Sequence, residues 1–146
     1  MQIPATEAIS LLRKWQQEIT LLQCALYDNP PDDEKAICVI MGYVEHIDEQ
    51  RLYIDGSHIE NLGNYGKYFS CNVTLADALY QFGDIRDAAD ERSAESFKTT
   101  HDCFLAILLP TGGLCEILAT KPKVRSLRSC LESRGNRFSV KKQRML

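Results

Sequence analysis

Apolar residues recur at helical spacing near the start of the chain, and this pattern predicts an amphipathic helix over residues 6–18. Thr6 is expected to cap its first turn, where Glu7 interacts favourably with the helix dipole. The apolar stripe consists of Ala8, Leu11, Leu12, Trp15 and Ile19. Because the other side of the helix is polar, we expect the stripe to pack against the rest of the domain.

Strand signals follow the helix. Runs rich in β-branched and aromatic residues alternate with turn-forming residues, and the turns are expected at residues 28–33 and 48–50. Gly42 lies within a long apolar run, and a glycine inside a strand is typical of a sharp bend or bulge in a small barrel. The predicted strands are residues 20–27, 36–47, 52–54 and 68–75.

Residues 75–82 fit two patterns. The apolar residues at positions 75, 79 and 82 match a short helix, with Thr74 as its cap. The residues at positions 76, 78, 80 and 82 fit one face of a strand instead. We favour the strand, because Gly83 and Asp84 end the run as a turn would and because aromatic residues favour sheets.

The clearest hairpin lies further along the chain, after a polar segment at residues 88–100 that is expected to be a loop or one helical turn. Residues 103–109 are apolar, residues 110–113 form the turn sequence Pro-Thr-Gly-Gly, and residues 114–119 return. The predicted fold class is mainly β with an N-terminal α-helix. We expect a small, strongly bent antiparallel β-barrel of five to six strands in residues 1–120 and a basic C-terminal tail in residues 121–146, with a helix at 124–134 as one option.

The region around the bend resembles the first signature of the Sm-like small barrels. That signature has a glycine in a long strand, then hydrophobic residues, an aspartate at the turn and a hydrophobic third strand. Here it is matched by Gly42, Val44, Ile47, Asp48, Leu52 and Ile54. With the N-terminal helix the resemblance covers residues 6–54, and SH3-like barrels share the pattern. The resemblance implies a small bent barrel. The family's second signature, a basic residue next to a glycine, has no counterpart in residues 110–113, so its uridine pocket and ring assembly are not implied.

The composition is that of an ordinary globular chain, with 45% hydrophobic and 25% charged residues, and 146 residues suffice for one domain with a core. Apolar runs are shorter than the roughly 18 residues that a membrane-spanning helix needs. The first residues lack the basic and apolar regions of a signal peptide. We therefore expect a cytoplasmic protein with no membrane partner.

The cysteines and histidines show no recognisable spacing. The six cysteines are at least twelve residues apart, which excludes a zinc knuckle of the usual kind. Cys38, Cys71 and Cys115 lie in apolar alternations, so we expect reduced, buried thiols. The histidines, at positions 46, 58 and 101, are expected at the surface or at strand edges. No catalytic motif, phosphate loop or calcium loop is present, and the sequence predicts no enzyme, no metal site and no cofactor.

Charge is distributed unevenly along the chain. Residues 1–120 contain 19 acidic and eight basic residues, a net charge of −11, whereas residues 121–146 contain nine basic residues and one acid, a net charge of +8. Such a tail is expected to meet an anionic surface, either nucleic acid or the acidic body of its own chain. The candidate anion contacts in the tail are Lys121, Lys123, Arg125, Arg128, Arg134, Arg137, Lys141, Lys142 and Arg144.

Tyr65 and Lys67 are further candidates, because an aromatic ring beside a base is suited to single-stranded nucleic acid. The other interpretation is a loop that feeds aromatic side chains into the core. Three functions thus stay open. The favoured one is a non-enzymatic interaction module that binds a protein partner, or a second copy of itself, through a strand edge. The alternative is RNA or DNA binding through residues 121–146, and the least favoured is an enzyme with an unmarked site.

Overall fold

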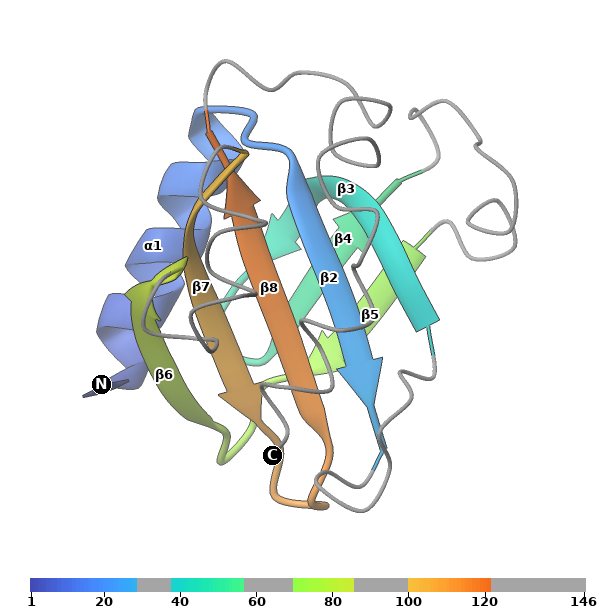
Figure 1. Ribbon diagram of the computed structural model, residues 1–146. Coiled ribbons are helices and arrows are strands. Elements are labelled where there is room, and N and C mark those ends of the chain that lie inside the picture. Colours follow the sequence, from blue (N-terminus) through green and yellow to red (C-terminus); the bar gives the residue numbers. More distant parts are fainter. Residues whose placement is uncertain (29–37, 57–69, 86–99, 122–146) are drawn as a thin grey trace.

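The computed structural model describes residues 1–28, 38–56, 70–85 and 100–121. These segments contain one helix and eight strands (Figure 1). In chain order they are β1 (Gln2–Ile3), α1 (Ala5–Gln17), β2 (Leu22–Tyr27), β3 (Cys38–Ile47), β4 (Arg51–Asp55), β5 (Ser70–Thr74), β6 (Leu79–Asp84), β7 (His101–Leu108) and β8 (Leu114–Thr120). The expectation of a mainly β protein with an N-terminal helix is confirmed.

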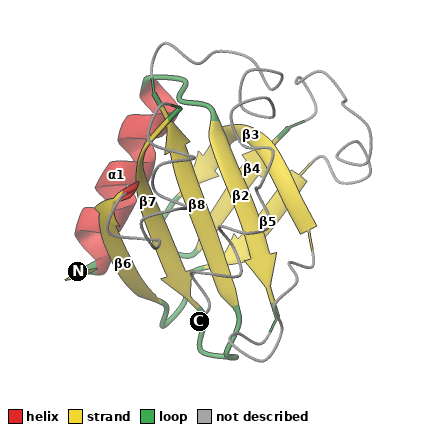
Figure 2. Cartoon of the chain, in the orientation of Figure 1, coloured by secondary structure: helices red, strands yellow, loops and turns green. Residues whose placement is uncertain are grey.

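The strands form one antiparallel sheet in the order β1-β6-β7-β8-β2-β3-β4-β5. The sheet has eight strands and is not closed, so the expected barrel of five to six strands is not confirmed. Its two ends are β1 and β5, which do not pair with each other. The sheet instead folds over on itself, and β3, β4 and β5 cross behind the layer formed by β6, β7, β8 and β2 (Figure 2).

The fold in the sheet occurs within β3, at Gly42. Up to Gly42 the strand pairs with β2, and from Tyr43 onward it pairs with β4. A Cβ atom on Gly42 would lie 2.6 Å from the carbonyl oxygen of Asp55 and 3.0 Å from the backbone nitrogen of Gly56. Glycine is therefore required here by the close approach of another backbone, as the sequence predicted.

The core lies between the two layers of the folded sheet. Its fully buried side chains come from both layers, and α1 covers one side of it by contacting β3 and β6. Core residues with at most 1% exposure include Leu12, Leu22, Cys24, Ile40, Leu52, Ile54, Leu105, Ile107, Cys115 and Ile117. Burial of these apolar surfaces is the main stabilising contribution to the fold.

Strands β2, β7 and β8 are also buried on their second face, which explains the nearly continuous apolar sequence of the predicted hairpin. The buried residues on that face include Ala25, Tyr27, Phe104, Ala106 and Leu118. A half-exposed hairpin would instead alternate apolar and polar residues. The hairpin itself is confirmed: β7 pairs with β8 from the pair His101–Thr120 to the pair Leu108–Leu114.

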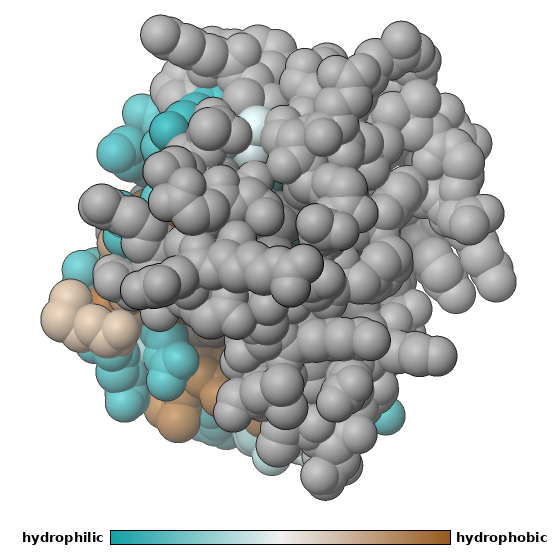
Figure 3. All heavy atoms as spheres, in the orientation of Figure 1, coloured by the Kyte–Doolittle hydropathy of each residue, from teal (hydrophilic) through white to brown (hydrophobic). Residues whose placement is uncertain are grey.

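The helix begins and ends differently from the prediction. Its N-cap is Pro4, and no side chain caps the first turn, so the assignment of Thr6 as the cap was wrong. Ile19 was expected in the apolar stripe, but it lies beyond the helix in a left-handed conformation (φ 53°) and is 63% exposed. Ile9, which the stripe omitted, is buried instead. On the side of α1 and β6, Figure 3 shows hydrophilic residues with hydrophobic ones among them.

The ambiguous segment divides into a turn and a strand. Residues 75–78 form the turn and Leu79–Asp84 form β6, so the preference for strand is confirmed from residue 79 onward. The short edge strand β1 was not predicted, because two residues carry no periodic signal.

Several predicted features lie outside the described residues. They are most of the turn at 28–33, the segment around Tyr65 and Lys67, the polar stretch at 88–99 and the tail from residue 122 onward. The six residues that resemble the Sm-like signature lie in β3, β4 and the turn between them, and the family assignment stays a prediction. In the described part of the chain no helix is long and apolar enough to cross a membrane.

Candidate functional site

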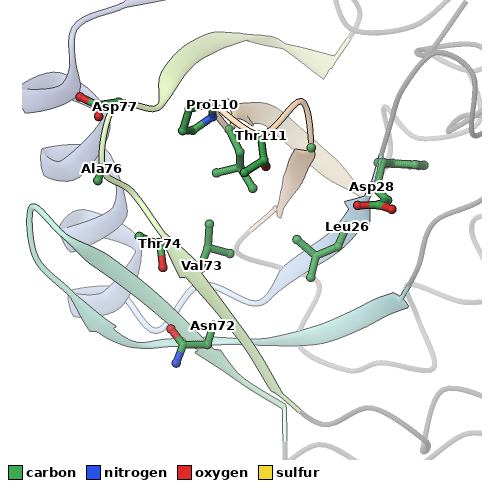
Figure 4. Close-up of a pocket in the computed structure, with 12 residues that line it drawn as sticks. Leu26, Asp28, Asn72, Val73, Thr74, Ala76, Asp77, Pro110 and Thr111 are labelled. Atoms are coloured by element: carbon green, nitrogen blue, oxygen red, sulfur yellow. The ribbon is translucent and has the colours of Figure 1, made fainter.

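A cavity of about 470 Å³ lies at the open end of the folded sheet (Figure 4). Its walls are the end of β2, strand β5 with the turn that follows it, and the turn between β7 and β8. The lining residues are Leu26, Tyr27, Asp28, Asn72, Val73, Thr74, Ala76, Asp77, Leu109, Pro110, Thr111 and Gly113. The volume falls within the range of binding cavities for small molecules or for a few residues of a peptide.

The interior of the cavity is apolar and its charged lining residues are acidic. Val73 points into the space from β5, and Leu26 approaches it from β2 (Figure 4). Asp28 and Asp77 are exposed lining residues at opposite sides of the cavity, and the Asp77 carboxylate points away from the space in Figure 4. No basic residue is among the lining residues that the structure describes. The cavity therefore favours an apolar ligand that also carries positive charge.

The outer edge of β5, with which no other strand of the described segments pairs, borders this cavity. The amide of Leu75 donates to the carbonyl of Gln50, so these two residues form a hydrogen-bonded pair, and Val73 with Leu52 form the next such pair of the β4–β5 ladder. Residues between hydrogen-bonded pairs direct their backbone groups away from the partner strand, so the N–H and C=O groups of Asn72 and Thr74 point away from β4. Both residues line the cavity. Their N–H and C=O groups thus offer an extended ligand the hydrogen bonds of an additional strand.

Two tight turns hold the cavity walls in place. After β5, Asp77 adopts a left-handed conformation (φ 58°), which aspartate tolerates better than most residues. On the other side, the amide of Leu109 donates to Gly113 at 2.9 Å, and the amide of Gly112 donates back to Leu109 at 2.9 Å. Gly112 has a φ of 98°, which favours glycine. The cavity therefore lies between hydrogen-bonded elements.

Three cysteine thiols meet in the core. The Sγ atoms of Cys24 and Cys115, on adjacent strands, are 3.5 Å apart, and those of Cys24 and Cys71, on opposite layers, are 3.9 Å apart. All three sulfur atoms lie within 4.8 Å of one another. Cys24 and Cys115 have no exposed surface and Cys71 has 3%. None of the three forms a disulfide.

Hydrogen bonds within this thiol cluster (Cys24, Cys71 and Cys115) separate its pKa values. Hydrogen bonds from Cys115 and Cys24 hold the pKa of Cys71 well below its ordinary value, although burial opposes this effect. The pKa of Cys24 is raised by its hydrogen bonds to Cys115 and Cys71 and by burial. The pKa of Cys115 also rises: its hydrogen bond with Cys24 lowers it, but its hydrogen bond to Cys71 and burial outweigh that effect. Cys71 is therefore the thiol of the cluster that loses its proton most readily.

The thiol cluster lies next to the cavity. Side chains two residues apart on a strand share a face. Leu26, Val73 and Gly113 line the cavity and each stands two residues from a cysteine of the cluster, on β2, on β5 and next to β8 respectively. In the antiparallel β2–β8 ladder Leu26 pairs with Cys115, so Cys115 lies level with a lining residue of the cavity. The cluster is thus adjacent to the cavity lining.

The remaining cysteine and histidine predictions are settled in part. Cys103 is a free, half-buried thiol, and its pKa is raised to about 11 by burial and by the charges of Asp102 and Asp84. His46 is exposed, as expected. His101 has no exposed surface, so its placement at the surface was wrong. The reason is that β7 is buried on both faces, and the Nδ1 atom of His101 lies 2.8 Å from the Thr100 hydroxyl.

The candidate anion contacts are not brought together within the described residues. Lys121 is half-buried, and its amide donates to the carbonyl of Thr100 at 2.8 Å. The other eight basic residues of the tail, with Tyr65 and Lys67, lie outside the described segments.

Searches against protein-family models, curated proteins and solved structures find no match to this chain.

Sequence reasoning missed both the cavity and the thiol cluster. The alternation in β5 places Cys71 inward and the apolar pattern places Cys115 inward, so burial of these thiols was predictable. Their convergence was not, because Cys24 and Cys71 meet through the folding of the sheet at Gly42. Positions 24, 71 and 115 are too far apart in sequence for any local motif.

Proposed function

We propose that this protein is a protein-interaction module that binds an extended, basic segment of a partner protein as an added strand beside β5. The observation that supports this most directly is that a five-residue strand, whose outer edge pairs with no other strand among the described residues, borders an apolar cavity with acidic lining residues. Exposed strand edges pair readily with other chains, and proteins usually protect them. In strand addition the backbone hydrogen bonds provide affinity, and side chains that enter adjacent pockets provide specificity.

The charge of the partner follows from the charge of the site. Asp28 and Asp77 are exposed lining residues of the cavity, and residues 1–120 have a net charge of −11. An acidic or neutral segment would gain nothing from this field, whereas lysine or arginine side chains would be attracted to it. The partner segment is therefore one in which basic residues alternate with apolar ones, so that one face enters the cavity.

The test uses the full chain and a fluorescent hexapeptide in which lysine and valine alternate, with a glutamate–valine hexapeptide as its control. Fluorescence anisotropy is expected to report binding of the basic probe and none of the acidic one. In the Asn72→Pro variant the affinity should fall at least about tenfold, since proline removes an outward-facing N–H and the ring obstructs the incoming strand. The same change leaves the ladder to β4 intact, because the Asn72 amide points away from β4.

Matched variants separate the contribution of the Asn72 backbone N–H to binding from that of the Asn72 side chain. Asn72→Ala keeps the N–H and should bind the probe within about threefold of the unchanged chain, because one exposed side chain contributes little. Replacing Asp28 and Asp77 together by asparagine should weaken binding a few-fold and reduce its dependence on salt. Equal binding by the Asn72→Pro and Asn72→Ala variants, or no binding of the basic probe, would overturn the proposal.

Two further measurements test the alternative partners, which are a second copy of the chain and RNA. Size-exclusion chromatography that shows a dimer, dissociated by Asn72→Pro, would assign the edge to a second copy of the chain. A short fluorescent RNA titrated near 50 mM salt should not bind tightly. Electrostatic attraction to a basic tail would still be strong at this salt, so the titration would detect binding through the tail if it occurred. Tight RNA binding that leaves the peptide site unoccupied would replace the present proposal by nucleic-acid binding through residues 121–146.

A further inference from the structure

The thiol cluster has a chemistry that peptide binding does not use. Cys24, Cys71 and Cys115 come from three strands and two layers, and their sulfur atoms form a triangle with two sides of 3.5 Å and 3.9 Å. Thiolate and thioether sulfur atoms are soft ligands that select Cu⁺, Zn²⁺ and iron–sulfur clusters over hard cations. Three such atoms at these separations form a donor set and not merely a packing contact.

We propose that Cys24, Cys71 and Cys115 form a binding site for a single Cu⁺ ion, held by their three sulfur atoms next to the cavity. The dimensions agree with this occupant. A metal ion at the centre of three sulfur atoms, with bonds of about 2.3 Å, places the sulfur atoms about 4 Å apart. The sulfur atoms all lie within 4.8 Å of one another, so small side-chain rotations suffice.

The number of ligands distinguishes Cu⁺ from Zn²⁺. Structural zinc sites are almost always four-coordinate. Among the described residues the group contains three cysteines and no fourth histidine, cysteine, aspartate or glutamate. Exposures of 0%, 3% and 0% leave little room for water as the fourth ligand. Three-coordinate binding is common for Cu⁺, so the cluster suits this ion better.

The protons of the three thiols are released when the ion binds. Cysteine coordinates a metal ion through its thiolate, so each coordinating cysteine loses its proton to solvent. No electron is transferred in this step.

The cavity lies next to the cluster. Its lining residues Leu26, Val73 and Gly113 each stand two residues along the chain from one of the three cysteines. A metal site within a folded core needs a route of entry, and we expect the ion to enter from the cavity. The copper site stands independently of the peptide proposal, because it concerns buried sulfur atoms and not the edge of β5.

The test titrates the reduced full chain with the coloured Cu⁺–bicinchoninate complex under argon. A background variant in which Cys38, Cys103 and Cys130 are alanine retains the cluster alone. We expect this variant to remove one equivalent of Cu⁺ from the chelator, to develop ultraviolet sulfur-to-copper charge-transfer absorption, and to melt at a higher temperature when loaded. Adding Cys24→Ala, Cys71→Ala or Cys115→Ala should weaken uptake at least about 100-fold.

Folding is controlled within the same series. Each variant is melted without copper, and Cys71→Val replaces the alanine variant if the latter does not fold, because valine restores apolar volume without a ligand atom. No uptake by the background variant would overturn the proposal, as would uptake that survives loss of Cys71 and of Cys115. Tighter binding of Zn²⁺ than of Cu⁺ by the background variant would overturn the choice of ion.

Discussion

The two ends of the sheet differ in how their edges are protected. At one end β1 is two residues long and is joined to β6 by two hydrogen bonds of Met1. The Met1 ammonium donates to the carbonyl of Phe82 at 3.1 Å, and the Phe82 amide donates to the carbonyl of Met1 at 2.9 Å. Helix α1 lies against β6 at this end. At the other end β5 is five residues long, and in the described part of the chain no strand or helix pairs with its outer edge.

This difference supports the proposal that a partner binds beside β5. A short edge beside a helix leaves few free backbone groups, whereas a longer edge beside a cavity leaves a row of them. Apolar burial follows the same division, since Leu12 on α1 is fully buried while Leu26 and Leu109 at the cavity are only partly buried. We therefore expect stability to depend mainly on the helix end, and binding on the cavity end.

The largest expected effect comes from removing apolar volume at the helix end. Leu12→Ala should lower the free energy of unfolding by about 2–5 kcal/mol, because it leaves a cavity in a fully buried site. Leu109→Ala is the matched change at the other end. Its cost should be smaller, because Leu109 is partly exposed and already borders an open cavity. Urea denaturation measures both, and an equal or larger loss for Leu109→Ala would contradict the division.

A smaller effect is expected at the bend between the two layers. Gly42→Val should destabilise by about 1–3 kcal/mol, because its Cβ would lie 2.6 Å from the Asp55 carbonyl oxygen and neither backbone can easily move. Gly113→Ala is the control, since its Cβ would lie 3.2 Å from the Tyr27 carbonyl oxygen. Thermal melting compares the two variants. A melting temperature for Gly42→Val within a degree of that of the unchanged chain would refute the close approach.

Local pattern was enough to predict most elements but not how the sheet closes. The helix, the long bent strand, its return strand and the β7–β8 hairpin all have strong periodic or turn signals in the sequence. The glycine at position 42 predicted a bend, and the structure places the change of strand partner there. Whether a bent sheet closes depends on contacts between distant strands. The pairing of β1 with β6, for example, joins residues 2 and 81.

The cavity could not be predicted from the sequence for the same physical reason. Each wall of the cavity contributes residues whose local pattern indicates ordinary turns or strands, such as the Pro-Thr-Gly-Gly sequence and the Asp77 turn. A cavity arises only when these walls are placed opposite one another. That a strand edge mediates binding stays a prediction from the sequence. Which strand lies at an edge could not be predicted, because order within a sheet is not encoded in any single segment.

The smallest expected effect concerns acid and the β3–β4 turn, which leads to the cavity end. Hydrogen bonds from the amide of Gln50, from His46 and from the amide of Arg51 lower the pKa of Asp48 from 3.8 to about 2. Because the folded-state pKa is below the unfolded one, the ionised carboxylate stabilises the fold above about pH 4. This contribution is lost as the pH falls towards 2. Asp48 is exposed, so we expect a small effect.

Asp48→Asn should therefore flatten the loss of stability between pH 4 and pH 2, measured by urea denaturation at several pH values. Glu49→Gln removes a neighbouring negative charge outside these hydrogen bonds and should leave the slope as it is in the unchanged chain. Nuclear magnetic resonance titration of the Asp48 carboxyl should give a pKa near 2. An ordinary pKa at Asp48, or equal slopes for both variants and the unchanged chain, would show that this turn contributes nothing to holding β4 and β5 against the rest of the sheet in acid.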